Sequence, residues 1–458
     1  MISITTKTCL PILILLVMAS GCQKYLDAKP DQQLVVPNTL NDLQALLDNY
    51  NKLNENDALA LAEVSADNYY LTDADWNSMP ETYRRMYTWE KDQLFSPYPN
   101  QWSYAYDKVY IANVVLDNLP NMARTEANKA EWDNIKGQAL CFRAKTFLDI
   151  ALVWALAYDK NTATTDLGIP LRLNANFNEV SVRSTLQQTY EQIIADFKQF
   201  LPLLPVTPRT VFRPSQPASY ALLARTYLAM REYDSAFKYS DRCLQLKNSL
   251  MDYNQDPQIN PAATYPFLQL NKEVIMESRS PVLSPVDNSR ARIDSGLYAS
   301  YNDNDLRKSL FFKSNNNGSF GFRGSYEGGA PLFTNIAVDE VYLMRAECAA
   351  RKEMVEAAMN DLNTLMAKRW KNTLPFPAFT ATNSSEALAL ILAERRKELL
   401  MRGVRWMDIK RLNKEGAGIA LSRVINGQAY VLPPNDLRFA LPIPEEVIQR
   451  SGMPQNPR

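Results

Sequence analysis

Apolar residues recur at intervals of three and four along most of the chain, which is the spacing of one face of an α-helix. Thr39 stands where its side chain can cap a first helix. Ser184 and Gln187 have the spacing of a capping box in front of a later one. The pattern predicts a mainly α-helical protein, with helices over residues 40–53, 102–119, 132–158 and 186–201.

A pair of helices joined by a short turn is predicted over residues 218–247, and its pattern returns 121 residues later. Small and apolar positions in this pair partly match the tetratricopeptide pattern, in which paired helices approach closely and stack on neighbouring pairs. Two weak copies indicate a helical scaffold without proving a solenoid. Corresponding residues in the two copies are Leu222 and Leu343, Glu232 and Glu353, Ala236 and Ala357, and Leu244 and Leu365.

Two stretches interrupt the helical periodicity. Residues 65–100 are polar and aromatic, and residues 249–335 are rich in Asn, Ser, Pro and Gly. We expect loops and a few short β-strands in the second stretch, and loops of this kind usually carry the specific function of a rigid scaffold. A C-terminal helix is predicted to begin near Ser385 and to end at Gly403.

The first residues read as an export signal. Lys7 supplies a positive charge, and an uncharged run from Leu10 to Ala19 follows that is too short to span a bilayer. Small residues then lead directly into Cys22, which resembles a lipobox. We therefore predict a signal peptide over residues 1–21 and fatty acyl chains such as palmitate on Cys22. The alternatives are ordinary secretion with a free Cys22 thiol, or an uncleaved anchor.

Composition narrows the classes of function. The chain contains no histidine, which excludes Ser-His-Asp and Cys-His triads and removes the commonest nitrogen ligand for metals. Lys plus Arg and Asp plus Glu both number 50, so no overall field would attract nucleic acid. The five cysteines form no C-x-x-C pair, and Cys141, Cys243 and Cys348 fall inside helical patterns. We predict a binding protein with no metal and no cofactor rather than an enzyme.

Several blocks, in order along nearly the whole mature chain, resemble the SusD/RagB family of outer-membrane nutrient-binding lipoproteins. The most specific is the block that begins at Glu394 and continues through Gly403, and the ordered set of blocks carries the resemblance. The blocks include Cys22 with Tyr25-Leu26-Asp27, Phe142-Arg143-Ala144, Leu167-Gly168-Ile169-Pro170, Glu394-Arg395-Arg396-Lys397-Glu398-Leu399, Gly403-Val404-Arg405-Trp406-Met407-Asp408 and Leu441-Pro442-Ile443-Pro444-Glu445.

The resemblance implies a single SusD-like domain over residues 22–458. Its N-terminal part would be residues 22–210 and its C-terminal part residues 211–458, with the loop-rich insertion 249–335 inside the latter. It also implies a surface lipoprotein of the outer membrane that binds a glycan, or in some relatives a peptide. The lipoprotein would deliver its ligand to a SusC-like TonB-dependent transporter barrel.

Sugar rings stack on aromatic planes and leave their hydroxyls for polar side chains, so aromatic-rich loops are candidate ligand sites. The family motifs do not fix ligand contacts, and each aromatic has packing in the core as its ordinary alternative. Trp102 also stands at the start of a predicted helix. Our candidate ligand-binding residues are Trp76, Trp89, Asn100, Trp102, Arg323 and Tyr326.

Charged residues are dense from 394 to 414, where eight are basic and three acidic. The spacing of Glu394 from Lys397, and of Glu398 from Arg402, predicts ion pairs along an exposed helix face. Trp406 is predicted to pack in the core. A separate acidic stretch, residues 73–77, has the first spacings of a calcium loop but lacks its glycine and final glutamate.

Two other classes of function stay open at the level of sequence. A helical-repeat scaffold for envelope assembly would have protein partners only. A glycosidase would use two carboxylates at a defined separation, and no such pair stands out in an aromatic context.

Overall fold

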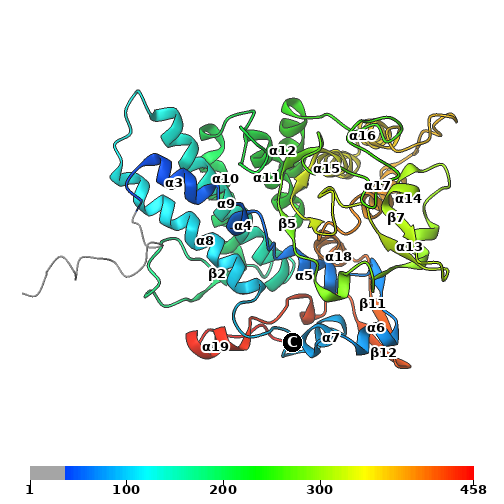
Figure 1. The fold of residues 1–458 in the computed structure, drawn as a ribbon, viewed down its shortest axis with the longest axis horizontal. Helices are drawn as coiled ribbons and strands as arrows, with labels where there is room; N and C mark the ends of the chain where they lie inside the picture. Colours follow the sequence, from blue (N-terminus) through cyan, green and yellow to red (C-terminus); the bar gives the residue numbers. More distant parts are fainter. Residues whose placement is uncertain (1–36) are drawn as a thin grey trace, which may run out of the picture.

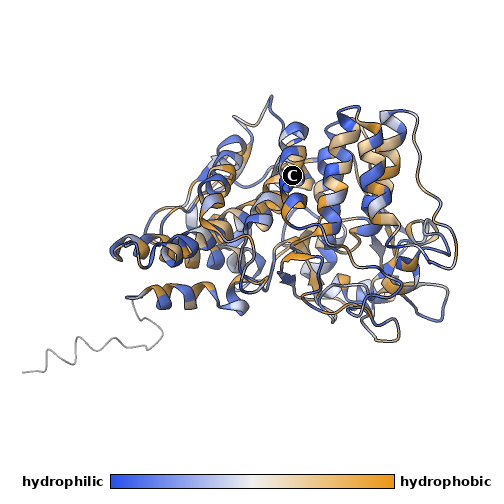
Figure 2. Ribbon diagram, turned by 90° about the horizontal axis from the view of Figure 1, so that it is seen from above, coloured by the Kyte–Doolittle hydropathy of each residue, from blue (hydrophilic) through white to orange (hydrophobic). Residues whose placement is uncertain are grey.

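The computed structural model describes residues 37–458; the predicted signal peptide and Cys22 lie outside the described residues. Long helices dominate, and the strands form short two-stranded antiparallel pairs, which confirms the mainly α-helical class (Figure 1). No helix in this part of the chain is long and apolar enough to cross a membrane. In Figure 2 the same helices carry polar and apolar stripes, as amphipathic helices around a shared core do.

The N-terminal part packs α3, α8 and α10 against the long helix α9. Thr39 caps α3 as predicted, but the expected helix over 40–53 breaks at Asp48 because the Asn49 side chain caps a new turn, accepting from Lys52 N. The helices of this part are α3 (Leu40–Leu47), α4 (Tyr50–Leu53), α5 (Leu59–Ser65), α6 (Asp73–Asn77), α7 (Glu81–Tyr87), α8 (Gln101–Asn118), α9 (Lys129–Trp154) and α10 (Leu186–Phe200).

The capping box in front of α10 is one residue later than predicted. Thr185 and Gln188 form it, because Ser184 still belongs to strand β3 (Arg183–Thr185) and donates to the carbonyl oxygen of Ile169 at 2.7 Å. Strand β3 pairs with β2 (Leu167–Pro170). The sequence signal located the helix correctly and misplaced its cap by one residue, since both Ser and Thr are favoured N-cap residues.

The predicted helix pairs are α11 (Gln216–Met230) with α12 (Tyr233–Leu246), and α15 (Val338–Arg351) with α16 (Val355–Met366). Helix α12 lies against α15, so the two pairs stack on each other. The turn between α15 and α16 is one residue longer than the turn between α11 and α12. Consequently Ala358, rather than the predicted Ala357, is the buried small residue that corresponds to Ala236.

Between the two pairs the chain forms the expected loops and short strands, together with two short helices that the pattern did not predict. The strands are β4 (Val274–Met276), β5 (Arg279–Ser280), β6 (Arg292–Ile293), β7 (Phe312–Ser314), β8 (Phe320–Phe322), β9 (Leu332–Phe333) and β10 (Ile336–Ala337), and the helices are α13 (Ser295–Ala299) and α14 (Leu306–Phe311). Strand β6 pairs with β1 (Tyr69–Tyr70) from the N-terminal part.

The C-terminal segment returns to the N-terminal part. Helix α17 (Ser384–Glu398) is followed by Gly403 in a left-handed conformation and then by α18 (Arg405–Asn413), which packs against α5. Trp406 is fully buried, as predicted. A hairpin of β11 (Leu421–Ile425) and β12 (Gln428–Leu432) and a last helix, α19 (Glu445–Ser451), complete the fold along its lower side in Figure 1.

Candidate functional site

Three of the six predicted ligand residues have structural roles in the interior of the protein. Trp89 is 2% exposed, and its indole N–H donates to the carbonyl oxygen of Ser65 at 3.0 Å. Trp102 is buried against Tyr106 and Trp154. Asn100 caps α8, since its Oδ1 accepts from Ser103 N at 3.2 Å. In this conformation the polar groups of Trp89 and Asn100 are engaged within the protein.

Arg323 and Tyr326 also have internal partners. Arg323 donates to three backbone carbonyls of neighbouring loops, and Tyr326 is fully buried with its hydroxyl 2.9 Å from that of Tyr253. Trp76 is half-buried on α6, where the Arg84 guanidinium lies 5.3 Å from its ring centre. The fold therefore does not bring the six predicted residues together in one site.

Instead, a groove opens between β1 and β11, and we call it the β1–β11 groove. Its volume is about 440 Å³. Five separate segments supply its walls, which explains why local sequence patterns did not reveal it. The lining residues are Asp67, Tyr69, Tyr70, Leu71, Tyr87, Trp89, Asp294, Arg396, Leu421, Ser422, Arg423 and Val424.

The floor of the groove is a cluster of aromatic rings around one buried cation. The Arg423 guanidinium lies 3.7 Å from the ring centre of Tyr87, 4.5 Å from that of Trp89 and 5.5 Å from that of Tyr69. It also donates to the carbonyl oxygen of Val64 at 3.0 Å. Cation–π contacts in a desolvated setting are worth about 2 kcal/mol, so Arg423 fixes the rings in place.

The rim of the groove is charged. Burial opposes ionisation of Asp67, but hydrogen bonds from Arg405 at 2.7 and 2.9 Å and the charges of Arg405 and Arg396 outweigh it and lower the pKa of Asp67. Burial lowers the pKa of Arg396, whose guanidinium lies 3.2 Å from the Asp67 carboxylate. Asp67 therefore stays ionised and is unsuited to act as a general acid near neutral pH.

Surfaces that a ligand can reach lie above this floor. Tyr70 is 38% exposed and Val424 is 63% exposed. Asn426 and Gly427 make the two-residue turn of the hairpin, so the main-chain N–H and carbonyl groups of Ser422 and Val424 point away from β12 and form the free edge of β11. An aromatic face beside polar edge groups suits a flat ring that carries hydroxyls.

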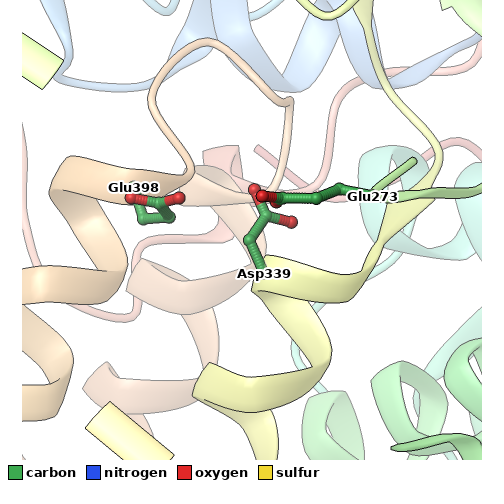
Figure 3. A group of neighbouring side chains, drawn as sticks. All are labelled: Glu273, Asp339 and Glu398. Atoms are coloured by element: carbon green, nitrogen blue, oxygen red, sulfur yellow. The ribbon is translucent and has the colours of Figure 1, made fainter. Parts of the chain in front are cut away.

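A second cluster has the acidic composition of a metal site, but groups of the protein already occupy its carboxylate oxygens. Ligand atoms of Glu273, Asp339 and Glu398 lie within 4.8 Å of one another, and all three side chains are buried (Figure 3). Every carboxylate oxygen already accepts a hydrogen bond. The donors are Met251 N, Tyr326 Oη, Glu340 N, Arg307, Arg369 and Arg402.

Those arginines supply the positive charge that a metal ion would bring. Burial raises the pKa of Glu273 to about 7, although Arg369 opposes this effect. We assign the cluster to the structural core. The acidic stretch 73–77 likewise forms helix α6 instead of a calcium loop, with Thr72 as its cap and Asp75 paired to Arg292 at 3.1 Å.

The prediction of an exposed charged face over 394–414 was wrong. Glu394, Arg395, Glu398, Arg402 and Arg411 are buried. The predicted pair of Glu394 with Lys397 is present, but Glu398 pairs with arginines from elsewhere and Arg402 pairs with Asp339. A helical wheel cannot show this, because the partners come from distant segments and satisfy the buried charges.

Comparisons with known proteins agree with this architecture. A family model described as "Starch-binding associating with outer membrane" matches residues 24–228, and one described as "SusD family" matches residues 245–458. The chain belongs to the SusD family, as the resemblance implied. Curated proteins gave no match.

Solved structures share the fold at low sequence identity. A SusD superfamily protein from Bacteroides thetaiotaomicron VPI-5482 is 21% identical, with a TM-score of 0.74, over 92% of this chain and 100% of that one. A putative sugar binding protein from Bacteroides vulgatus ATCC 8482 is 21% identical, with a TM-score of 0.74, over 92% and 99%. A laminarin binding SusD-like protein is 17% identical, with a TM-score of 0.65, over 91% and 97%.

Proposed function

We propose that the protein is a lipid-anchored lipoprotein of the outer-membrane surface that binds a glycan without transforming it and delivers it to a TonB-dependent transporter. The family description supports association with starch and the outer membrane, and the names of two similar structures refer to sugar and laminarin. The lipid anchor at Cys22 remains a prediction from the sequence.

The observation that carries glycan binding is the β1–β11 groove. A ring seated there would lie on Tyr70 and the aromatic floor, and its hydroxyls would meet Arg396, Asp294 and the free edge of β11. Within residues 37–458, Asp294 Oδ1 accepts from Leu297 N at 2.8 Å and the other carboxylate oxygen is left for a ligand. The groove thus offers both donors and acceptors around an apolar surface.

Exposed apolar residues beside the groove support a protein partner on the same side. Val424 is exposed on the outer face of the hairpin and Val431 is 50% exposed on the neighbouring strand, opposite Ser422. Apolar patches of this kind are typical of surfaces that another protein covers. A transporter docked there would receive a ligand directly from the groove.

Glycan binding is tested by isothermal titration calorimetry of the mature protein with laminarin and soluble starch. Tyr70→Ala is expected to weaken binding at least about tenfold, because it removes the exposed ring that a sugar would stack on. Tyr98→Ala is the matched control, since Tyr98 is 68% exposed and lies outside the groove. Equal affinities for the two variants would place the glycan elsewhere.

The transporter partnership is tested by co-purification of the tagged full-length protein from native membranes, with Cys22→Ala as control. Recovery of a large barrel protein that depends on Cys22 would support delivery. Recovery of assembly factors alone would favour the scaffold hypothesis instead.

A further inference from the structure

A second cavity, which we call the α8 pocket, lies in the N-terminal part and shares no lining residue with the β1–β11 groove. Its volume is about 270 Å³. One face of α8 forms the floor, where the rings of Trp102 and Tyr106 pack with their centres 4.8 Å apart. The loop that follows β2 closes one side and the C-terminal region closes another, through Val447 and Met453.

The loop over the pocket is held in place by contacts of its own. Asn113 donates to the carbonyl oxygens of Arg172 at 2.8 Å and Asn174 at 3.1 Å. Asp117 accepts from Ala175 N at 2.7 Å. Arg172 donates back to the carbonyl oxygen of Glu179 at 2.7 Å. The shape of the pocket therefore does not depend on a ligand, and a preformed pocket loses little entropy on binding.

Two polar side chains in the walls, Tyr106 and Asn113, are already used by the protein. The Tyr106 hydroxyl donates to the carbonyl oxygen of Pro170 at 2.8 Å, and Asn113 Oδ1 accepts from Arg143 at 2.9 Å. Within residues 37–458 the Tyr110 hydroxyl, at the rim, has no hydrogen-bond partner. A sugar bound here would lose the water around its hydroxyls without gaining hydrogen bonds in return. An apolar ring with a single polar group would not suffer this loss.

The rim carries an exposed aromatic residue. Phe177 lines the pocket and is 78% exposed. A ring seated in the pocket would cover part of this exposed apolar surface and remove it from water. A cavity of about 150 Å³ suffices for one benzene molecule, so the α8 pocket has room for about two fused rings.

We propose that the α8 pocket binds a small aromatic compound of one or two rings that carries a single hydrogen-bonding group, as phenols and indoles do. The rings would lie between Tyr106 and Phe177, and the polar group would meet the Tyr110 hydroxyl. This site is separate from the proposed glycan groove and does not depend on it.

The test is calorimetric titration of the mature protein with 2-naphthol, for which we expect a dissociation constant on the order of 0.1 mM. Ala175→Trp, which fills the pocket from its rim, is expected to weaken binding at least about tenfold. Leu173→Trp on the same loop is the control, because Leu173 does not line the pocket. Circular dichroism of both variants establishes that they are folded.

Two further titrations test which kind of ligand the α8 pocket binds. Tyr110→Phe should weaken binding of 2-naphthol and leave that of naphthalene unchanged. Saturating laminarin should leave 2-naphthol binding unchanged, whereas displacement would make the pocket part of the glycan site and overturn the proposal. Absence of saturable binding, or equal binding by Ala175→Trp and Leu173→Trp, would overturn it as well. If the β1–β11 groove were found to bind no glycan, none of these expected results would change.

Discussion

Glu398 accepts hydrogen bonds from two buried arginines of other segments, Arg369 at 2.8 Å and Arg307 at 3.0 Å. Both guanidiniums also have other carboxylate partners, since Arg307 pairs with Asp305 and Glu394 and Arg369 pairs with Glu273. Glu398 is the carboxylate that the two arginines share, so it links their ion pairs into one buried network. Several acidic and basic residues of α17 and α18 are therefore core residues, and Glu394 and Glu398 join the loop-rich insertion to the C-terminal helices through Arg307.

We expect Glu398→Gln to lower the free energy of unfolding by roughly 1.5–3 kcal/mol, because it weakens hydrogen bonds to two charged groups while both arginines keep other carboxylate partners. Urea unfolding followed by circular dichroism measures it. Glu356→Gln on the exposed side of α16 is the control, expected to stay within about 0.5 kcal/mol of the wild type. A loss no larger than that of the control would show that Glu398 has no such structural role.

Glu277 and Glu327 are neighbouring buried carboxyl groups, placed so that one proton can be shared between them. Tyr50 donates to Glu277 at 2.8 Å and Gln269 donates to Glu327 at 3.0 Å. Burial, and then the proximity of Glu277, raise the pKa of Glu327 to about 9, and burial raises the pKa of Glu277 to about 7. The folded protein thus keeps protons that the unfolded chain releases.

The sign of the pH dependence follows from these raised values. Stability from this pair is present at low pH and is lost as the pH rises from about 4.5 towards 9, by about 1.4 kcal/mol per pH unit for each proton retained. We expect Glu327→Gln to lose less stability than the wild type between pH 5 and pH 9 in urea unfolding. Identical slopes for the two proteins would contradict the shared proton.

At the scale of elements, the sequence pattern was most reliable where a helix has a clear amphipathic face and a clear end. The predicted end of the C-terminal helix at Gly403 was wrong, because α17 ends at Glu398. Gly403 lies in the connection between α17 and α18, and the structure shows why glycine is needed there. Its φ is +74°, and a Cβ atom would lie 2.7 Å from the carbonyl oxygen of Leu59. The close approach of α5 could not be deduced from the sequence.

We expect Gly403→Ala to destabilise the protein by roughly 2–4 kcal/mol, because it adds a steric clash to the strain of a left-handed alanine. Gly416→Ala is the matched control, since its φ is +88° and no atom lies within 4 Å of the new Cβ. We expect about 1 kcal/mol for the control, from the backbone alone. Thermal unfolding compares the two, and equal losses would rule out the clash with Leu59.

At the scale of the whole molecule, the N- and C-terminal parts share one core. Asp57 pairs with Lys108 at 2.5 Å and accepts from Thr334 at 2.8 Å. Asn456, near the C-terminus, donates to the carbonyl oxygen of Trp154 at 2.7 Å. The two matched family segments meet between residues 228 and 245, yet helix α11 before this junction packs on α15 after it.

We therefore expect the predicted single domain to unfold in one transition. Tryptophan fluorescence and circular dichroism should give the same urea midpoint, and a fragment ending at residue 210 should not fold alone. Two separate midpoints, or a stably folded fragment, would show that the parts are independent domains.

The sequence by itself determined the helical class, the stacked helix pairs, the core position of Trp406 and the family, because amphipathic periodicity and ordered motifs are local properties of the chain. Only the tertiary structure decided which aromatics are exposed, where charged residues lie, and which segments form the grooves. These depend on contacts between residues hundreds of positions apart. A tryptophan in a polar loop looks the same whether it faces solvent, like a ligand platform, or a buried arginine, as Trp89 does.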